Sequence, residues 1–567
     1  MTWEPVTLVE IVLPYCNNTF SVAPCTATGT NYCYNTFSTC RDPENFAKGT
    51  RSEWYCTPDE ASRGVVDGAI PSVVSVSTVP SVINFAGADE DFSGLGGRSR
   101  CTITFKDHTH SDIGRDPYLP LRGGDPLSSG TYWTKWIVRN KYRQDVVIRV
   151  YEGTAGQSLG EMYKRTYFMT DNTFPDANGF SITGQDPIAM LEADSALIPP
   201  ASQGEVFSDM TAGQTSMIIA GGTIAEYDTS GVLRIDDELI RYTGRETVDD
   251  GLRITGMTRG SFGTVAEEHD AETQVQMCLF FDNVTVDDAY AELTRKSRSG
   301  RIPVAYLDLD QWSEQMLETL ADYTVYGVVS EPTSAAEIIG RIQLQTLSFL
   351  FWDEQDAKVY MRVVKGWSTP PDVLDDDVNF MSFSVEELTD QRITQLWFSY
   401  AMRDQTDEDT YKRVIVSADL DAESDNEYGD SVRRDIAGNF TARKIQALDV
   451  AGRYMRKYTD VPRRVSFELD QKDKARRLGD VIGISHRLLI DEHGNRSVTY
   501  WMITECEPLL RQGKIRYVAE ETTDYGRLYY IMSGSAPDYS GTRPEKSAYI
   551  GNAAGLLSDG TIGALFS

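Results

Sequence analysis

The sequence predicts a multidomain, mainly β protein of β-barrel or β-sandwich domains with one α+β helical segment. Its 567 residues are too many for one hydrophobic core and, at about 150 residues per domain, correspond to roughly three to five domains. Short runs of alternating or β-branched residues, bounded by Gly and Pro, recur along most of the chain. Helix signals concentrate in one stretch, from about 283 to 352.

The first predicted domain covers residues 1–182 and is rich in β-structure. Runs at 73–79, 101–106 and 145–153 alternate or are β-branched, which is typical of strands. The first residues of the chain also alternate, with acidic side chains between apolar ones. This pattern predicts a strand rather than a signal peptide, and we expect the protein to fold in a cytosol.

A small β-barrel or β-sandwich module is expected as an insertion over residues 203–280. Two strand patterns, 232–243 and 252–259, lie on either side of the sequence Asp-Asp-Gly at 249–251. An Asp-Gly pair flanked by apolar residues is a strong signal for a β-hairpin. The two stretches are therefore predicted to pair.

The helical segment belongs to a third predicted domain, residues 281–400. A capping box from Ser334 to Glu337 predicts the start of a helix that is apolar on more than one side, and we expect that helix to be buried between neighbours. Helices are also predicted after Thr285 and over 313–320, where one apolar face would hold Met316, Leu317 and Leu320.

The last third is predicted to return to β-structure in a C-terminal domain, residues 401–532. A helix is expected from Ala437 to Lys457, and the strand patterns lie at 414–416, 464–469, 480–486 and 497–505. Residues 533–567 are rich in Gly, Ser, Pro and Ala. This composition predicts an extended tail, or one that is ordered only against a partner.

The composition makes two classes of function unfavourable. Lys and Arg number 54 against 85 Asp and Glu, so the formal net charge is −31. Such a surface repels nucleic acid phosphates and no long basic run is present, so we expect no stable nucleic acid binding. No apolar run reaches the length of about 18 residues that a bilayer requires, so we expect no transmembrane segment.

Catalytic motifs are scarce, and we expect the protein not to be an enzyme. Only five His occur, and the His-Glu-x-x-His, Gly-x-Ser-x-Gly and P-loop patterns are missing. In the one dense group of His and carboxylates, 107–112, His108 and His110 would share one face of a strand. So short a pattern recurs by chance, so a hydrogen-bonded loop is favoured over a metal site. The acidic run at 419–430 departs from the calcium-loop pattern and is interpreted as a solvated loop.

Four of the eight cysteines lie close together near the start of the chain: Cys16, Cys25, Cys33 and Cys40. Their spacing, C-x8-C-x7-C-x6-C, lacks the tight knuckles of structural zinc sites and the C-x2-C runs of bacterial ferredoxins. An iron–sulfur cluster needs only four convergent thiolates, and disulfides would suit a protein that matures outside the cell. The spacing alone leaves a cluster, a zinc ion, disulfides and no role as open alternatives.

Longer stretches of sequence are more specific. The run from Cys25 to Phe46 strongly resembles the opening of a family of siphophage tail-tip hub proteins. Further stretches similar to that family are 105–118, 258–269, 275–279 and 555–560. The matches follow in order along nearly the whole chain, which makes coincidence a poor explanation.

The cysteine pattern is also similar to that of hub proteins from phage lambda and gene transfer agents. In the lambda member, a C-x8-C pair and a C-x6-C pair hold an iron–sulfur cluster. Carried over to this sequence, Cys16 and Cys25 form the first pair and Cys33 and Cys40 the second, with a shorter spacer between the pairs. The resemblance therefore implies a [4Fe-4S] cluster on these four residues. Cys56 follows Cys40 after only 15 residues, so it is a candidate to replace one of the four.

The implied cluster is expected to act as a structural staple. The cysteine segment is rich in Gly, Thr and Asn and has few apolar residues, so it buries little surface. Metal–thiolate bonds would supply the missing folding energy. The remaining cysteines, Cys101, Cys278 and Cys506, lie in apolar strand contexts and are interpreted as small buried hydrophobes.

The resemblance implies a structural baseplate hub of a siphophage tail tip. Such a hub closes the tail tube as a homotrimer, so the expected partners are further copies of this chain, the distal tail protein, the central tail fibre protein and the tape measure protein. The expected location is the virion tail tip, after assembly in the cytoplasm of the bacterial host. Two alternatives stay open: a tail-associated cell-wall hydrolase, and a receptor-binding adhesin with disulfides in place of the cluster.

Overall fold

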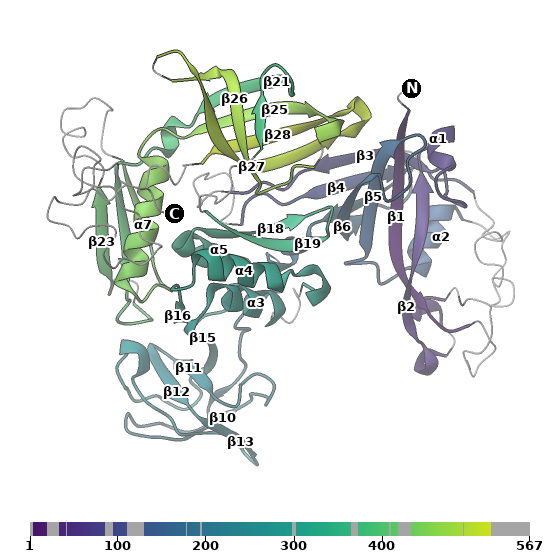
Figure 1. Cartoon of the computed structure of the whole chain (residues 1–567). Coiled ribbons are helices and arrows are strands. Elements are labelled where there is room, and N and C mark those ends of the chain that lie inside the picture. The colour runs from purple at the N-terminus through teal and green to yellow at the C-terminus, as the bar shows by residue number, and fades with distance from the viewer. Residues whose placement is uncertain are drawn as a thin grey trace.

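Strands dominate the protein and form several separate sheets, so the predicted multidomain, mainly β fold is confirmed (Figure 1). No helix in the part of the chain that the structure describes is long and apolar enough to cross a membrane. The computed structural model describes residues 4–19, 33, 35–40, 42–84, 95–109, 130–176, 179–192, 196–296, 302–364, 372–407, 410–417, 432–473, 475–491 and 493–522.

A seven-stranded antiparallel sheet forms the N-terminal domain, in the order β2-β1-β5-β6-β7-β4-β3. Its strands are β1 (Pro5–Cys16), β2 (Lys48–Cys56), β3 (Val73–Val79), β4 (Arg100–Phe105), β5 (Val147–Thr154), β6 (Tyr163–Asn172) and β7 (Phe180–Gln185). The short helix α1 (Glu60–Arg63) follows β2.

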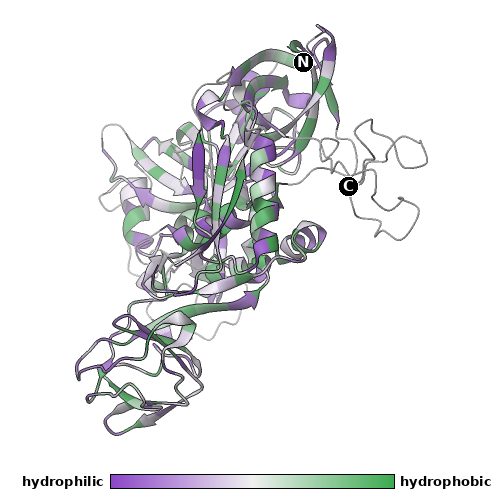
Figure 2. Ribbon diagram, turned by 90° about the vertical axis from the view of Figure 1, so that its left-hand side faces the viewer, coloured by the Kyte–Doolittle hydropathy of each residue, from purple (hydrophilic) through white to green (hydrophobic). Residues whose placement is uncertain are grey.

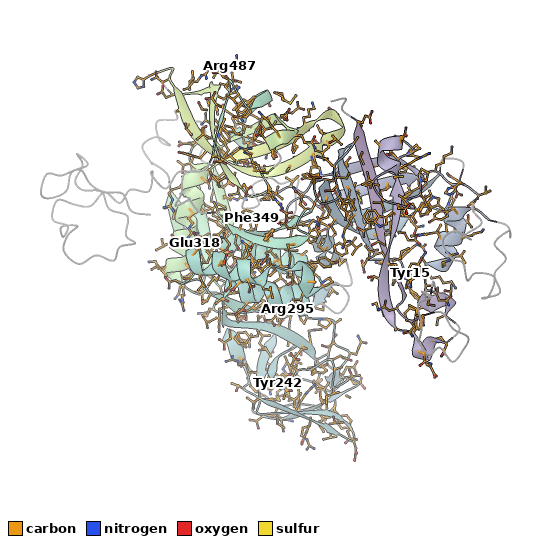
Figure 3. All side chains as sticks on the ribbon, turned by 45° about the vertical axis from the view of Figure 1, so that its right-hand side comes forward. Tyr15, Tyr242, Arg295, Glu318, Phe349 and Arg487 are labelled. Atoms are coloured by element: carbon orange, nitrogen blue, oxygen red, sulfur yellow. The ribbon has the colours of Figure 1, made fainter. Side chains whose placement is uncertain are left out.

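Helix α2 (Tyr132–Arg139) covers one face of this sheet. Trp133 stacks on Phe180 of β7, with ring centroids 4.5 Å apart. Because successive strand residues point to opposite faces, alternate side chains of β1 enter the same core, namely Val9, Ile11, Leu13 and Tyr15. Tyr15 lies near one end of the sheet, as Figure 3 shows.

The inserted module has a core of its own and lies at one end of the molecule (Figures 1 and 2). The predicted turn at 249–251 is confirmed, since Val248 pairs with Gly251. The predicted pairing of 232–243 with 252–259 is wrong, because the hairpin joins 244–248 to 251–255. The stretch 232–243 is not one strand, because a turn at Asp236 (φ 50°) divides it. The strands are β9 (Glu205–Val206), β10 (Met217–Ala220), β11 (Gly231–Ile235), β12 (Glu238–Tyr242), β13 (Gly244–Val248) and β14 (Gly251–Thr255).

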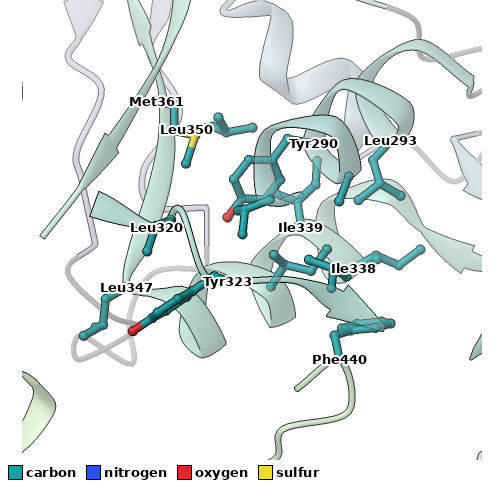
Figure 4. Close-up of a cluster of buried hydrophobic side chains, with 14 of the residues drawn as sticks. Tyr290, Leu293, Leu320, Tyr323, Ile338, Ile339, Leu347, Leu350, Met361 and Phe440 are labelled. Carbon is teal, nitrogen blue, oxygen red and sulfur yellow. The ribbon is translucent and has the colours of Figure 1, made fainter. Parts of the chain in front are cut away.

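The central domain holds α3, α4, α5 and α7 and the largest core, part of which is drawn in Figure 4. Its helices are α3 (Val286–Lys296), α4 (Leu309–Thr319), α5 (Ala335–Thr346) and α7 (Lys444–Tyr458). Its strands are β8 (Leu197–Ile198), β15 (Gln276–Val284), β16 (Val325–Val329), β17 (Thr333–Ser334), β18 (Ser348–Asp353), β19 (Lys358–Val363), β22 (Gln395–Tyr400), β23 (Lys412–Ser417) and β24 (Arg433–Ile436).

Most of the helix signals are confirmed. The Ser334 side chain accepts a hydrogen bond from the Glu337 amide at 3.2 Å, as an N-cap should. Met316 and Leu320 are buried. Leu317 is not, at 70% exposed, because it follows Met316 by one residue and a helix turns about 100° per residue. The helix expected over 437–457 begins later, at Lys444.

A six-stranded sheet in the order β20-β26-β27-β28-β25-β21 forms the C-terminal domain. Its strands are β20 (Val373–Asp375), β21 (Phe380–Glu387), β25 (Arg463–Asp470), β26 (Val481–Ile490), β27 (Arg496–Leu509) and β28 (Lys514–Glu521). The chain therefore enters this sheet with β20 and β21, returns to the central domain for β22–β24 and α7, and then comes back. A single boundary at residue 400 does not describe this exchange of strands.

Candidate functional site

The cysteine segment begins at the end of β1, which pairs with the edge strand β2 of the N-terminal sheet. Cys16 is the last residue of β1 and lies opposite Lys48 of β2. Only 2% of its surface is exposed. Cys16 follows Tyr15 by one residue in the same strand, so its side chain points to the face of the sheet opposite that core.

A second piece of the segment pairs with the first. The amide of Cys16 donates to the Asn35 oxygen at 2.9 Å, and the amide of Cys33 donates to the Asn18 oxygen at 3.1 Å. Cys33 is also buried, at 4% exposed. Two of the predicted ligands therefore lie on neighbouring, hydrogen-bonded stretches of backbone.

The third predicted ligand follows a short 3-10 helix that docks on α2. This turn, η1 (Phe37–Thr39), ends at Cys40, which is half-buried. The hydroxyls of Thr36 and Ser38 both donate to the oxygen of Arg139, at 2.8 and 3.2 Å. They satisfy a carbonyl at the C-terminal end of α2 that the helix leaves without an internal partner. The cysteine segment is in this way fixed to the N-terminal domain.

The donor set of this corner suits thiolate ligands. The Asn35 side-chain amide donates to Cys33 Sγ at 3.5 Å. Hydrogen bonds to sulfur are a usual feature around iron–sulfur clusters, where they tune the ligand charge. We refer to residues 16–18, 33 and 35–40 as the cysteine corner.

Cys25, the fourth predicted ligand, lies outside the described residues. Within the described ranges no three His, Cys, Asp or Glu side chains are grouped so that they could hold a single metal ion. Among the described residues, Cys16, Cys33 and Cys40 therefore do not form such a single-ion site.

The structure argues against Cys56 as a substitute ligand. Cys56 lies opposite Leu8 on β1, whereas Cys16 ends the same strand eight residues later. At about 3.3 Å per residue, the two positions are roughly 26 Å apart. The sequence separation of Cys56 from Cys40 is short, but β2 runs away from the cysteine corner. Burial raises the pKa of the Cys56 thiol, as expected for a core residue.

The other sequence candidates are placed as follows. His108 stacks on Tyr132 of α2, with ring centroids 5.1 Å apart, while His110 and the acidic run 419–430 lie outside the described residues. Cys101 and Cys278 are buried as expected, and burial raises the pKa of each thiol to about 12. Cys506, in contrast, is only partly buried.

A buried polar network in the inserted module was not assigned from the sequence. Arg259 donates to both carboxylate oxygens of Glu238, at 2.7 and 2.6 Å. The Gly260 amide contacts the same carboxylate at 2.7 Å, and His269 lies 2.9 Å from it. Burial alone would raise the pKa of Glu238, but these hydrogen bonds outweigh it and lower the pKa to about 2. All three partners of Glu238 lie in the stretch 258–269.

A second buried cluster lies where the three main domains meet. Tyr167 of β6 donates to Glu354 in the turn between β18 and β19 at 3.1 Å. Arg477, just before β26, contacts both carboxylate oxygens of Asp353 at 3.0 Å. Burial raises the pKa of Glu354 to about 7, against the opposing effect of Arg165. A cavity of about 30 Å³ lies against this turn, room for about one water.

Comparison with known proteins gives no family assignment. No family model matches the chain, and no curated protein matches it. The solved structures similar to it include a tail protein from Neisseria meningitidis MC58, at 9% identity, 79% of this chain, 92% of that chain and a TM-score of 0.36. Another is the 43 kDa tail protein of prophage MuSo2 from Shewanella oneidensis, at 10% identity over 79% of this chain and 94% of that chain, with a TM-score of 0.35. A chain of the native gene transfer agent particle has 13% identity over 57% of this chain and 85% of that chain, with a TM-score of 0.32. Superpositions at these TM-scores establish neither a common fold nor a common function.

Proposed function

We propose that the chain is a structural baseplate hub of a siphophage tail tip and is not an enzyme. The proposal starts from the ordered sequence matches to the tail-tip hub family, among them 105–118 and 258–269. The observation that carries it is the cysteine corner. There, Cys16 and Cys33 lie on hydrogen-bonded neighbouring segments, and Cys40 ends a turn that docks beside them.

The residues that would hold a [4Fe-4S] cluster are Cys16, Cys25, Cys33 and Cys40. A cluster bound there would supply metal–thiolate bonds that fasten a segment with few apolar side chains. The chain's own contribution is the docking of Thr36 and Ser38 on α2, which fixes the second cysteine pair against the N-terminal sheet. We infer a structural staple rather than a redox centre.

The proposed hub acts as a homotrimer at the virion tail tip, assembled in the host cytoplasm. Its proposed partners are the distal tail protein, the central tail fibre protein and the tape measure protein. A trimer would carry 3 × −31 = −93 formal charges. Where such charge faces the tube lumen it repels DNA and eases its passage.

The experiment is a metal analysis of the full chain purified without oxygen. We expect about four iron and four acid-labile sulfide per chain, with the visible absorption of a cluster. Serine variants of the four proposed ligands should lose both. Cys56→Ser and Cys101→Ser are matched controls, because both thiols are buried in the same sheet and neither belongs to the cysteine corner.

Zinc or disulfides in place of iron and sulfide would contradict the cluster. If Cys56→Ser lost iron while Cys101→Ser kept it, Cys56 would be a ligand and the proposed ligand set would be wrong. The hub role is tested separately, by complementing a phage that lacks this gene. If the protein is a hub, a defective variant should yield no complete tails. If it is an adhesin, a defective variant should yield complete virions with an altered host range.

A further inference from the structure

Asn35 lies at the centre of the cysteine corner and makes three bonds that join its parts. Its backbone oxygen accepts from the Cys16 amide at 2.9 Å. Its side-chain nitrogen donates to Cys33 Sγ at 3.5 Å, and its side-chain oxygen accepts from the Thr39 hydroxyl at 3.2 Å. Asn35 is only 7% exposed, so water competes little for these bonds.

The chemistry of these contacts requires an amide side chain. Asn35 presents a donor toward the sulfur and an acceptor toward the hydroxyl on one short planar group. An Asp at this position would keep the acceptor but would have no donor for the sulfur. An Ala would have neither, although its backbone could still receive the bond from Cys16.

We propose that Asn35 is the positioning residue of the cysteine corner, an inference that rests on the proposed [4Fe-4S] cluster. Its backbone bond holds the segment of Cys16 beside that of Cys33. Its side-chain N–H faces the Cys33 sulfur. With a cluster bound, this donor would stabilise the more negative, reduced form and would therefore raise the reduction potential.

The test compares Asn35→Asp and Asn35→Ala with the wild-type full chain, purified without oxygen. Asn18→Asp and Asn18→Ala are matched controls, because Asn18 lies in the same corner but donates to the Asn45 oxygen, at 2.6 Å. Iron and acid-labile sulfide are measured first. The reduction potential is then measured by titration with a chemical reductant that supplies one electron per cluster, while the visible sulfur-to-iron charge-transfer band is recorded.

We expect both Asn35 variants to have a lower reduction potential than the wild type and than the matching Asn18 variants. Their charge-transfer band should move to longer wavelength, because a sulfur without its hydrogen bond gives up electron density more easily. The two Ala variants add no charge, so the difference between them isolates the lost donor. Loss of iron from the Asn35 variants alone, with an unchanged far-ultraviolet circular dichroism spectrum, also supports the proposal.

Equal iron content and equal potentials in the Asn35 and Asn18 variants would overturn the proposal while leaving the cluster in place. A wild-type chain that contains neither iron nor sulfide would remove the cluster, and the inference with it. The two failures are thus distinguished by the wild-type measurement.

Discussion

Glu238 joins three separate stretches of the inserted module through one carboxylate. Its side chain is 1% exposed and that of Arg259 is 6% exposed. Glu238→Gln removes the negative charge and leaves the guanidinium buried without its partner. Breaking a buried pair in this way costs about 3–5 kcal/mol. We expect the unfolding midpoint of the module in urea to fall accordingly, as followed by amide hydrogen exchange in β11 and β12.

Glu246→Gln is the matched control for that measurement. Glu246 pairs with Arg253 in the same module, but both side chains are about half exposed. Exposed pairs contribute only about 0–1 kcal/mol, so this variant should stay close to wild type. Equal losses in the two variants would show that burial of the Glu238 network does not matter.

The Glu238 carboxylate also gives the module a pH dependence of known sign. Its folded pKa of about 2 lies below the unfolded value of about 4.3. The stabilisation is therefore complete above about pH 4.3 and is lost as the pH falls toward 2. Chemical denaturation from pH 6 down to pH 2.5 should show this loss in the wild type and not in Glu238→Gln. A wild-type slope that persists in the variant would assign it to other groups.

The roles of single residues were predicted well where they depend on neighbouring residues in the sequence, and poorly where they depend on the pairing of distant strands. The Ser334 N-cap depends only on the next three residues and was found. The distance of Cys56 from the other cysteines follows from the register of β2 on β1, which no local pattern contains. The partner of Arg259 and His269 was missed for the same reason, because Glu238 lies 21 residues before Arg259, in strand β12.

At the scale of elements, the loop 260–264 fastens the inserted module to the central domain. The Gln405 amide, in the loop after β22, donates to the Phe262 oxygen at 3.2 Å. Gly263 has a φ of +87°, and a Cβ at this position would collide with the carbonyl oxygen of Arg403. The close approach of two backbones explains why glycine stands here.

Gly263→Ala should therefore loosen the contact between the module and the central domain. Gly156→Ala is the control, because Gly156 has a φ of +90° but no atom lies near its missing Cβ. Both variants bear the backbone strain of a positive φ, while only Gly263→Ala adds overpacking of about 1–3 kcal/mol. Amide exchange in the loop after β22 should increase in Gly263→Ala alone. Equal exchange in both variants would contradict the fastening role.

The elements themselves follow from sequence periodicity, but their grouping into domains does not. The turn at 249–251 and the helix after Ser334 are local and were predicted, whereas the strand that enters this turn, 244–248, was not. Strands β20 and β21 precede β22 in the chain yet belong to the C-terminal sheet with β25–β28. That membership depends on pairs such as Val385 with Val465, eighty residues apart, which a single sequence does not reveal.

At the scale of the whole molecule, the turn between β18 and β19 ties the domains together. Trp352 donates from its indole to the Thr166 oxygen of the N-terminal sheet at 3.0 Å. Asp353 pairs with Arg477 of the C-terminal domain. Ile83, just after β3, donates its amide to the Thr504 oxygen of β27 at 2.9 Å. These contacts are two hydrogen bonds and an ion pair, and the junction also contains the buried carboxyl group of Glu354.

Glu354 is the group in this junction whose titration falls near neutral pH. Its folded pKa of about 7 lies above the unfolded value of about 4.3, so the folded chain holds a proton that the unfolded chain releases. Stability from this group is complete below about pH 4.3 and declines as the pH rises to about 7. The charged and titratable groups around it are Arg165, Tyr167, Asp186, Asp353, Arg477 and Cys506.

Glu354→Gln keeps the acceptor for Tyr167 but has no proton to lose. The difference in unfolding free energy between variant and wild type should therefore grow from pH 4.5 to pH 7.5, in favour of the variant, by at most about 3 kcal/mol. Asp356→Asn, in the same turn but 45% exposed, should show no such growth, because exposed ion pairs contribute little. Chemical denaturation across this pH range measures all three proteins. A constant difference between Glu354→Gln and wild type would mean that the carboxyl is already ionised in the folded junction, held so by Arg165.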